Sequence, residues 1–389
     1  MVISKSKKVA KLFFILTFSG LIMYIILAFY SLHRAHRFNA EEKRHWQGVT
    51  QKTDQSLKYI LIVTKNPKLF SSIEGQKLFI DYQCPHFLCY LTTNKTLPSY
   101  KQEFDAVVIN VTDVSKVSLL RARLKNQRYI FYGMEPSDQV PVCNPDADNF
   151  FNYTWSYKLN SDIVSPFFVV RDVNDSVVAP SLYAEWTMSM PKSSLKVEEV
   201  MKLKNKNKAV AMIVKGCKDN EGKIYADKLR EALKVYQEEL HVFGCKRSYP
   251  LAGSGAIIAR EYFYVLVTAG TAQDYVTDKV LNAYWNNAVP IIRARADLTK
   301  FLPPGSYINA HLQTPEQIAA LVHYSINNPS VYRSFFKWRN FYTFRKREEF
   351  DGICQICSLL NDKASFYSNS SAHLREWWES SSTSKIKCA

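Results

Sequence analysis

Short apolar runs separated by amphipathic segments are the feature that most constrains the fold of this chain. The first three runs are Tyr59–Val63, Asp105–Ile109 and Tyr129–Tyr132, and each is bounded by polar residues. Buried parallel strands have this pattern. Between the last two runs, Val114–Lys125 mixes Leu with Arg and Lys at helical spacing. The order of strand, helix and strand predicts an open α/β sheet.

A second series of strands is expected after a polar bridge at Lys202–Lys208. Its apolar runs are Ala209–Val214, Leu240–Gly244 and Phe263–Val267. Three apolar residues at intervals of four positions, with Lys and Glu opposite, predict an amphipathic helix after the first of these runs. They are Tyr225, Leu229 and Leu233.

Two further segments, Pro315–Ile326 and Pro329–Phe344, each begin with Pro in the first turn, and helices are expected there. Two successive α/β units then predict two Rossmann-like domains that face one another across a cleft. They are expected at residues 57–200 and 201–360, followed by a C-terminal tail at residues 361–389. Ligands of such sheets lie at the carboxyl ends of the strands.

An apolar run at Leu12–Tyr30 contains no charged residue and predicts a membrane anchor. Its length matches the roughly 30 Å hydrocarbon core of a bilayer. Four lysines precede the run, which favours a cytosolic tail at residues 1–11. A cleaved signal peptide would have a shorter apolar region and a small-x-small cleavage site, and neither is evident. The polar residues 31–56 are expected to form a stem.

Five sequons of the form N-x-[ST] follow this anchor and are candidate glycosylation sites. They begin at Asn94, Asn110, Asn152, Asn174 and Asn369. Their common position on one side of an anchor favours a lumenal or extracellular location. Eight cysteines agree with an oxidising compartment. We therefore expect a single-pass type II membrane protein.

The composition excludes a mainly disordered protein, because 47% of the residues are hydrophobic and 14% are aromatic. A formal net charge of +16 suits nucleic acid, a membrane surface or anionic small molecules as partners. The expected compartment holds no nucleic acid, so no nucleic-acid partner is expected. Most of the Lys and Arg residues are expected to be solvated, and a minority to bind a diphosphate.

The segment from Asp274 to Lys279 is the most informative one for function. Asp274 is expected to cap a helix, which leaves the first-turn N–H groups free to face an anion. Carboxylate, hydroxyl, phenol and ammonium groups lie within these six residues. Such a set suits a sugar nucleotide, with its ribose, pyrophosphate and hexose. The helix is expected to lead into a short apolar strand through a Val289-Pro290 step.

This segment resembles the donor signature of the α1,3-fucosyltransferases, which is roughly D-Y-[IV]-T-E-K. Four other blocks resemble parts of the same family: a long F-N-W-type block, a buried D-A-V-[VI] strand, an F-x-W-[RK] helix and a closing C-x-x-C. They lie at Phe150–Ile163, Asp105–Val108, Phe336–Arg339 and Cys354–Cys357. Their common order along residues 60–358 identifies the chain as a divergent member of that family.

The resemblance implies a Golgi enzyme of the GT-B type, with two Rossmann-like domains behind a single transmembrane helix and a stem. The family transfers fucose from GDP-fucose to a hydroxyl of a glycan or glycoprotein, with inversion, and an α1,3 linkage to N-acetylglucosamine is expected. The donor-binding residues implied by the match are Lys223, Tyr275, Thr277, Asp278 and Lys279. With cations to neutralise the diphosphate, no metal or other cofactor is expected to be essential, and stimulation by a divalent ion is left open.

Glu135 follows the strand Tyr129–Tyr132, at the edge of the sheet where catalytic loops gather. The family has a glutamate here that acts as general base. An inverting transfer needs one carboxylate to remove the proton of the acceptor hydroxyl. A wall of Phe131, Tyr132 and Met134 is expected to sharpen Glu135 as a base. The alternative is a surface glutamate in a turn before Pro136.

The C-x-x-C at Cys354 and Cys357 has no second such motif and no nearby His pair, so structural disulfides are favoured over a zinc site. The family ties this pair back to N-terminal cysteines, which implies Cys84 and Cys89 as partners. Cys217 and Cys245 form a further candidate pair. Connectivity cannot be deduced from sequence, and Cys143 and Cys388 stay unassigned.

Asp146-Ala147-Asp148 spells a DxD, which holds a divalent ion in other glycosyltransferases. A polar loop that begins at Asn144-Pro145 is the favoured interpretation, and no metal site is expected. Trp377-Trp378 is expected to cover the edge of a core.

The chain departs from the family pattern in the expected donor domain. Thr268-Ala269 replaces a Glu-Asn pair that helps to hold the donor, and Lys223 stands near a family arginine. Lys offers a point charge where Arg offers a planar fork. Asp278 is one methylene shorter than the usual Glu. These changes motivate an alternative function, a catalytically weak or inactive relative that acts as a glycan-binding membrane protein. A type II receptor is disfavoured by the short cytosolic tail.

Overall fold

A computed structural model describes the chain at residues 56–64, 74–97, 104–114, 127–187, 206–214, 220–244, 254–347, 352–361 and 373–379. All of these residues except Ser56 lie within one compact unit, Leu57–Ala389. The predicted cytosolic tail, anchor and nearly all of the stem lie outside the described residues. Among the residues that are described, no helix has both the length and the apolar character needed to cross a membrane.

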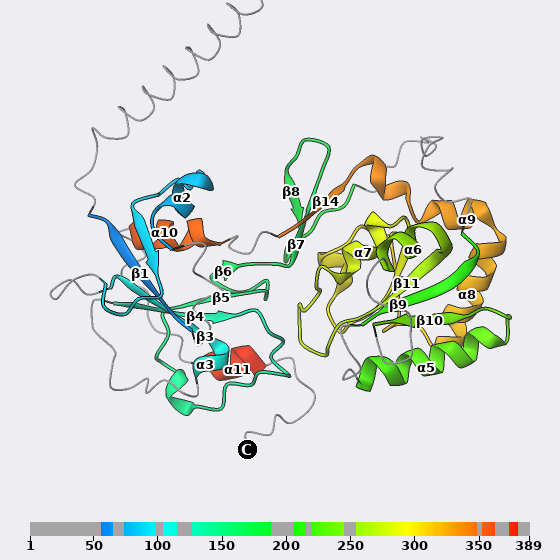
Figure 1. Cartoon of the computed structure of the whole chain (residues 1–389), viewed down its shortest axis with the longest axis horizontal. Coiled ribbons are helices and arrows are strands. Elements are labelled where there is room, and N and C mark those ends of the chain that lie inside the picture. Colours follow the sequence, from blue (N-terminus) through cyan, green and yellow to red (C-terminus); the bar gives the residue numbers. More distant parts are fainter. Residues whose placement is uncertain are drawn as a thin grey trace, which may run out of the picture. The chain divides into compact units, whose positions relative to one another are not determined.

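The first sheet has six parallel strands in the order β2-β1-β3-β4-β5-β6 (Figure 1). The strands are β1 (Lys58–Val63), β2 (Cys89–Thr92), β3 (Ala106–Asn110), β4 (Arg128–Gly133), β5 (Tyr153–Ser156) and β6 (Ile163–Val164). The first three predicted strands are therefore confirmed as β1, β3 and β4. The helix predicted at Val114–Lys125 is described only at its start, where α3 spans Val111–Val114.

The second sheet has five parallel strands in the order β10-β9-β11-β12-β13. They are β9 (Lys208–Ile213), β10 (Leu240–Phe243), β11 (Tyr262–Thr268), β12 (Val289–Arg293) and β13 (Ile308–Asn309). In both sheets the second strand lies on one side of the first strand and all later strands lie on the other side. Ligands of doubly wound sheets bind near such a switch point, beyond the carboxyl ends of the strands.

Helices cover both faces of the second sheet. One face packs against α5 (Asn220–Lys234) and α8 (Pro315–Asn327). The other packs against α6 (Ser254–Glu261) and α7 (Lys279–Trp285). Residues of β12 alternate between the two faces. Val289 and Ile291 lie in the core with α5 and α8, and Ile292 lies in the core with α6 and α7. The predicted amphipathic helix is α5, whose Tyr225, Leu229 and Leu233 are all buried.

A third sheet corrects the prediction of one helix over Pro329–Phe344. The helix α9 ends at Ser334, a 3₁₀ turn η5 follows at Lys337–Asn340, and β14 spans Thr343–Lys346. The strand β14 pairs antiparallel with β7 (Phe168–Arg171), which also pairs with β8 (Val177–Ala179). The Phe344 ring packs on Trp338 and stacks on Tyr284. These long-range contacts override the local helical pattern.

Residues on both sides of the expected division at residue 200 contribute to the cores of both sheets. Phe168 and Val170 of β7 belong to the core of the second sheet, although they precede the division. The helices α10 (Ile353–Asn361) and α11 (Leu374–Glu379) instead pack on the first sheet, on opposite faces. The chain therefore crosses between the two sheets more than once.

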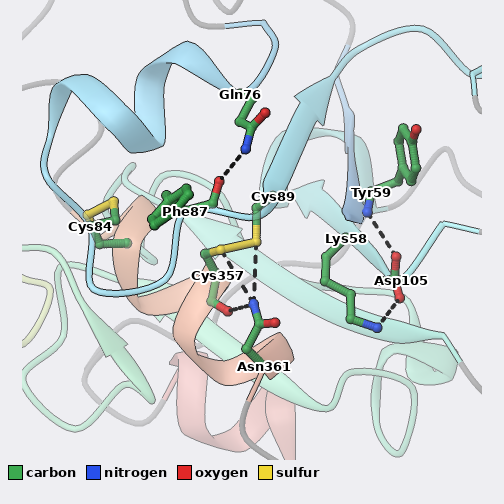
Figure 2. Close-up of a disulfide and its surroundings, with 10 residues drawn as sticks. Lys58, Tyr59, Gln76, Cys84, Phe87, Cys89, Asp105, Cys357 and Asn361 are labelled. Atoms are coloured by element: carbon green, nitrogen blue, oxygen red, sulfur yellow. Dashed lines mark hydrogen bonds and ion pairs between the residues drawn. A yellow bond between two sulfur atoms is a disulfide. The ribbon is translucent and has the colours of Figure 1, made fainter. Parts of the chain in front are cut away.

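Two disulfides attach α10 to β2 of the first sheet and to the segment just before β2 (Figure 2). They join Cys84 to Cys354 and Cys89 to Cys357, which are the four cysteines that the family resemblance pairs. Asn361 supports the second bridge by donating from Nδ2 to the carbonyl of Cys357 at 2.8 Å. Cys143 is also disulfide-bonded. Cys217, Cys245 and Cys388 lie outside the described residues.

At the amino ends of β1 and β3, Asp105 ties the two strands together (Figure 2). Its Oδ1 lies 3.1 Å from Nζ of Lys58, and its Oδ2 accepts the backbone N–H of Tyr59 at 2.8 Å. The start of the D-A-V-V block is therefore a structural contact between neighbouring strands rather than part of the sheet's carboxyl edge.

Lys206, in the segment interpreted from sequence as a polar bridge, is buried. Its Nζ donates to the carbonyls of Ile258 at 2.9 Å and Tyr262 at 2.7 Å. Burial lowers the pKa of Lys206 to about 7. This lysine therefore joins the end of α6 to the start of β11, and it is not part of a solvated linker.

Candidate active site

Three loops that follow carboxyl ends of strands form the candidate site. Met134–Asp138 follows β4, Tyr157–Asn160 follows β5, and Ala269–Asp278 follows β11. Glu135 lies two residues beyond β4, as predicted. The loops contact one another through side chains and backbone, as described below, so the first and second sheets contribute to one group of residues.

The Tyr275 ring lies within this group. It makes edge-to-face contacts with Tyr157 and Phe167, at ring-centroid distances of 5.0 and 5.3 Å. Burial raises the pKa of the Tyr275 phenol to about 12, and three carboxylates add to the rise: Glu135, Asp138 and Asp278. The expected base, Glu135, and the expected donor residue Asp278 therefore both act electrostatically on Tyr275.

The helix cap predicted at Asp274 is wrong. The helix α7 begins at Lys279, its N-cap residue is Asp278, and no side chain caps it. Asp274 is only 3% exposed, has a φ of 58°, and accepts the N–H of Leu159 on Oδ2 at 3.1 Å. Burial raises the pKa of Asp274. The carboxylate therefore accepts a hydrogen bond from a backbone N–H 115 residues away, and it does not cap the helix as local spacing predicts.

Lys158 is a site component that the sequence interpretation missed. Its side chain is fully buried, and its Nζ donates to the carbonyl oxygens of Trp377 and Trp378 in α11. Burial lowers the pKa of Lys158 to about 8, and the nearby charge of Asp274 opposes that effect. Lys158 thus supports α11 and, through the adjacent Leu159, the loop that carries Asp274.

Asp138 joins the loop after β4 to the loop after β11. Its Oδ2 accepts two hydrogen bonds from Thr271, from the backbone N–H at 3.0 Å and from the hydroxyl at 2.6 Å. A Cβ on Gly270 would lie 3.2 Å from the same oxygen, so glycine permits the close approach. Within the described residues, Asp138 Oδ1 and the buried Ser137 Oγ have no hydrogen-bond partner. In the sequence, only their position directly after Glu135-Pro136 indicates that Ser137 and Asp138 belong to the site.

Asp278 and Thr277 lie at the entry to α7. Asp278 Oδ2 is 2.7 Å from Nζ of Lys346 on β14. The Thr277 side chain is buried, and its Oγ1 has no hydrogen-bond partner among the described residues. An unpaired buried hydroxyl costs free energy, so a ligand that contacts Thr277 would offset that cost.

Lys279 and Lys223, the cations expected at the diphosphate, are both exposed. Lys279 is the first residue of α7, and Lys223 lies near the start of α5, so both lie at the carboxyl side of the second sheet. Glu135 is exposed as well. The predicted apolar wall around it is not found, because Phe131 packs against Trp378 and Tyr132 against Trp155.

The DxD segment has a structural role. Asn144 caps the 3₁₀ turn η3 (Pro145–Ala147) by accepting from the N–H of Asp146. Asp148 forms an ion pair with Arg375 of α11 at 2.7 Å. In the part of the chain that the structure describes, no three His, Cys, Asp or Glu side chains are grouped so as to hold a metal ion.

The described sequons differ in accessibility. Asn94 and Asn174 are exposed, and Asn110 is partly buried. Asn152 is only 7% exposed, and its Oδ1 accepts the N–H of Tyr129 at 2.9 Å. An oligosaccharide on Nδ2 is incompatible with that burial in the folded chain. Asn369 lies outside the described residues.

Two doubly wound parallel sheets, with a polar group contributed by loops at their carboxyl ends, place this chain in the class of Rossmann-like α/β proteins. Two family models match it consecutively. The model "Fucosyltransferase, N-terminal" matches residues 55–168, and "Glycosyltransferase family 10 (fucosyltransferase) C-term" matches residues 203–377. The chain therefore belongs to glycosyltransferase family 10 and is a fucosyltransferase-like enzyme.

Curated relatives agree with this family. "Alpha-(1,3)-fucosyltransferase C" of Drosophila melanogaster is 27% identical over 355 residues, which cover 86% of this chain and 80% of the relative. "Glycoprotein 3-alpha-L-fucosyltransferase A" of the same fly is 24% identical, covering 78% and 57%. Human "Alpha-(1,3)-fucosyltransferase 4" is 26% identical, covering 66% and 46%. The chain thus spans less than two thirds of the length of the last two relatives.

Among solved structures, the chain is similar to "Crystal Structure of alpha1,3-Fucosyltransferase with GDP-fucose". The TM-score is 0.49 and the identity is 14%, with 83% of this chain and 94% of the other covered.

Proposed function

We propose that this chain transfers fucose from GDP-fucose to a hydroxyl of a glycan or glycoprotein, forming an α1,3 linkage to N-acetylglucosamine. Membership of glycosyltransferase family 10 and the names of the curated relatives support fucose as the transferred sugar and the α1,3 linkage. The observation that carries the assignment is the juxtaposition at Tyr275. There, the Tyr275 ring from the second sheet contacts Tyr157 from the first at 5.0 Å, and Asp138, three residues after Glu135, accepts two hydrogen bonds from Thr271.

In this proposal the reaction is a single displacement with inversion. The acceptor oxygen attacks C1 of fucose as the bond from C1 to the phosphate oxygen breaks, and GDP leaves. The Glu135 carboxylate, exposed at the end of β4, takes the proton of the acceptor hydroxyl. Lys279 and Lys223 offset the negative charge that grows on the diphosphate, so that no metal is essential.

We further propose that the enzyme is a single-pass type II protein of the Golgi membrane. Residues 12–30 would anchor it, and the active site would lie in the lumen. Two disulfides and the exposed sequons Asn94 and Asn174 support an oxidising, glycosylating compartment. Removal of N-glycans from the membrane fraction should lower the apparent mass, and a carbonate-extractable protein of unchanged mass would contradict the topology.

The substitution Glu135→Gln tests the chemistry, because it keeps size and hydrogen bonding but removes proton acceptance. Release of GDP from GDP-fucose in the presence of a glycan acceptor should fall by about 10²- to 10⁴-fold, while the affinity for GDP stays within about twofold. Asp146→Asn, an acidic residue of the η3 loop, is the matched control and should keep full turnover. Near-normal turnover of the Glu135 variant would place the base elsewhere.

The alternative function, a weak or inactive glycan-binding relative, is motivated by Thr268-Ala269 at the end of β11. It requires that purified full-length chain bind glycans but release no GDP above background. The same assay therefore separates the two functions.

A further inference from the structure

Arg293 is the last residue of β12, and its side chain is exposed. Its register partner is Thr268, the last residue of β11. The backbone N–H of Ala269 donates to the Arg293 carbonyl at 3.0 Å, which fixes the end of the strand. The guanidinium therefore leaves the second sheet at its carboxyl edge, where ligands of such sheets bind.

The guanidinium is held by an aromatic ring. Its central carbon lies 4.4 Å from the ring centroid of Tyr225 on α5. Val289 and Ile291 pack on the same face of β12, against α5 and α8, and strand alternation puts Arg293 on that face too. A stacked guanidinium loses less freedom when it binds an anion, because its plane is already oriented.

Tyr225 supplies a second polar group beside this guanidinium. Its ring is only 4% exposed, and its hydroxyl has no hydrogen-bond partner among the described residues. A buried hydroxyl without a partner costs free energy. An oxyanion can accept from a hydroxyl and from a guanidinium fork together, so a phosphate group suits both.

One nearby carboxylate opposes this charge. Glu316, in the first turn of α8, raises the pKa of the Tyr225 phenol, whereas Arg293 lowers it. Glu316 is exposed, so water and salt screen it. Lys223, two positions before Tyr225 on α5, adds a further exposed cation. Among the charged groups that act on Tyr225, the cation Arg293 therefore faces a single, solvent-screened carboxylate.

We propose that Arg293, stacked on Tyr225, binds the diphosphate of the nucleotide-sugar donor and provides the planar fork that Lys223 cannot provide. This inference rests on the proposed use of a GDP-sugar, and it adds a binding residue outside the Asp274–Lys279 segment. Arg293 contacts phosphate oxygens, and it neither takes nor gives a proton in the reaction.

Calorimetric titration of the full-length chain in detergent tests the assignment, with GDP and guanosine as the two probes. Arg293→Ala should weaken GDP binding by about 10- to 100-fold, the loss expected for charge-assisted hydrogen bonds. Guanosine lacks the phosphates, so its affinity should change by no more than about twofold. Arg293→Lys should recover part of the GDP affinity, and Tyr225→Phe should lose about threefold.

Arg260→Ala is the matched control, because this exposed arginine lies at the end of α6, at the amino edge of the same sheet. It should leave both affinities unchanged. Unaltered GDP affinity in the Arg293→Ala variant would overturn the assignment, and so would an equal loss of GDP and guanosine. If the unsubstituted chain binds no GDP, the proposed function itself fails, and that outcome is distinct from both.

Discussion

The two disulfides that attach α10 to the first sheet should contribute to stability in a strongly non-additive way. Cys84–Cys354 and Cys89–Cys357 close loops with sequence separations of 270 and 268 residues. Cys84 and Cys89 lie close together in the sequence, as do Cys354 and Cys357, so the two bridges join the same two short segments. Once one bridge is closed, the other closes a ring of only about ten residues.

Loop-closure entropy converts this geometry into free energies of unfolding. A bridge that closes a loop of this length in an otherwise open chain is worth about 6 kcal/mol at 25 °C, whereas a second bridge that closes a ten-residue ring adds about 3 kcal/mol. Replacement of either pair by alanine should therefore cost about 3 kcal/mol, because the remaining bridge still closes the long loop. Replacement of both pairs should cost about 9 kcal/mol.

Alanine is preferred to serine, since Cys89 and Cys357 are fully buried and a serine hydroxyl there would be unsatisfied. Urea unfolding of the full-length chain, followed by tryptophan fluorescence, would measure the free energies of unfolding of the two single-pair variants and the double-pair variant. The two single-pair variants serve as controls for one another. The reasoning is refuted if the double variant loses no more than the two single losses together.

Two further predictions follow from buried polar side chains. The pKa of Lys158 is lowered by burial to about 8, below its value of about 10.5 in an unfolded chain. The unfolded state then binds more protons than the folded state above pH 8, so the free energy of unfolding should rise by up to about 1.4 kcal/mol per pH unit between pH 8 and 10. Urea titrations should show no such rise for Lys158→Met. An equal rise in the unsubstituted chain and the variant would contradict this prediction. Asn152 should carry no glycan in the folded protein. Enzymatic deglycosylation converts a glycosylated Asn to Asp, so peptide mass spectrometry of the deglycosylated protein would check this prediction, with the exposed Asn94 for comparison. Conversion of Asn152 to Asp would show the burial argument to be wrong.

Local pattern was sufficient for the framework of both sheets. The strands β1, β3 and β4 could be predicted because each is a short run of apolar residues whose burial depends on hydrophobicity alone. The helix α5 could be predicted because its buried residues repeat at helical spacing. The place of Glu135 after β4 followed from the same reasoning, since its position depends only on where a strand ends.

Contacts between distant segments decided what local pattern could not. The sequence from Pro329 to Phe344 has helical features, yet its last part pairs with β7 as β14, because only the fold brings that edge strand within reach. Asp274 has the spacing of a helix cap, yet the N–H of Leu159 takes its carboxylate. A local preference of about 1 kcal/mol is easily outweighed by such tertiary contacts.

By itself, the sequence determined the α/β class, the family and the neighbourhood of the site, because each depends on the order of residues along the chain. The tertiary structure decided which charged side chains are solvated. Lys206 and Lys158 look like surface lysines in the sequence, but both are buried against backbone carbonyls. The tertiary structure also brought Tyr225 and Arg293 into contact. Burial and charge pairing depend on distances in space, and residues far apart in the sequence set those distances only when the chain folds.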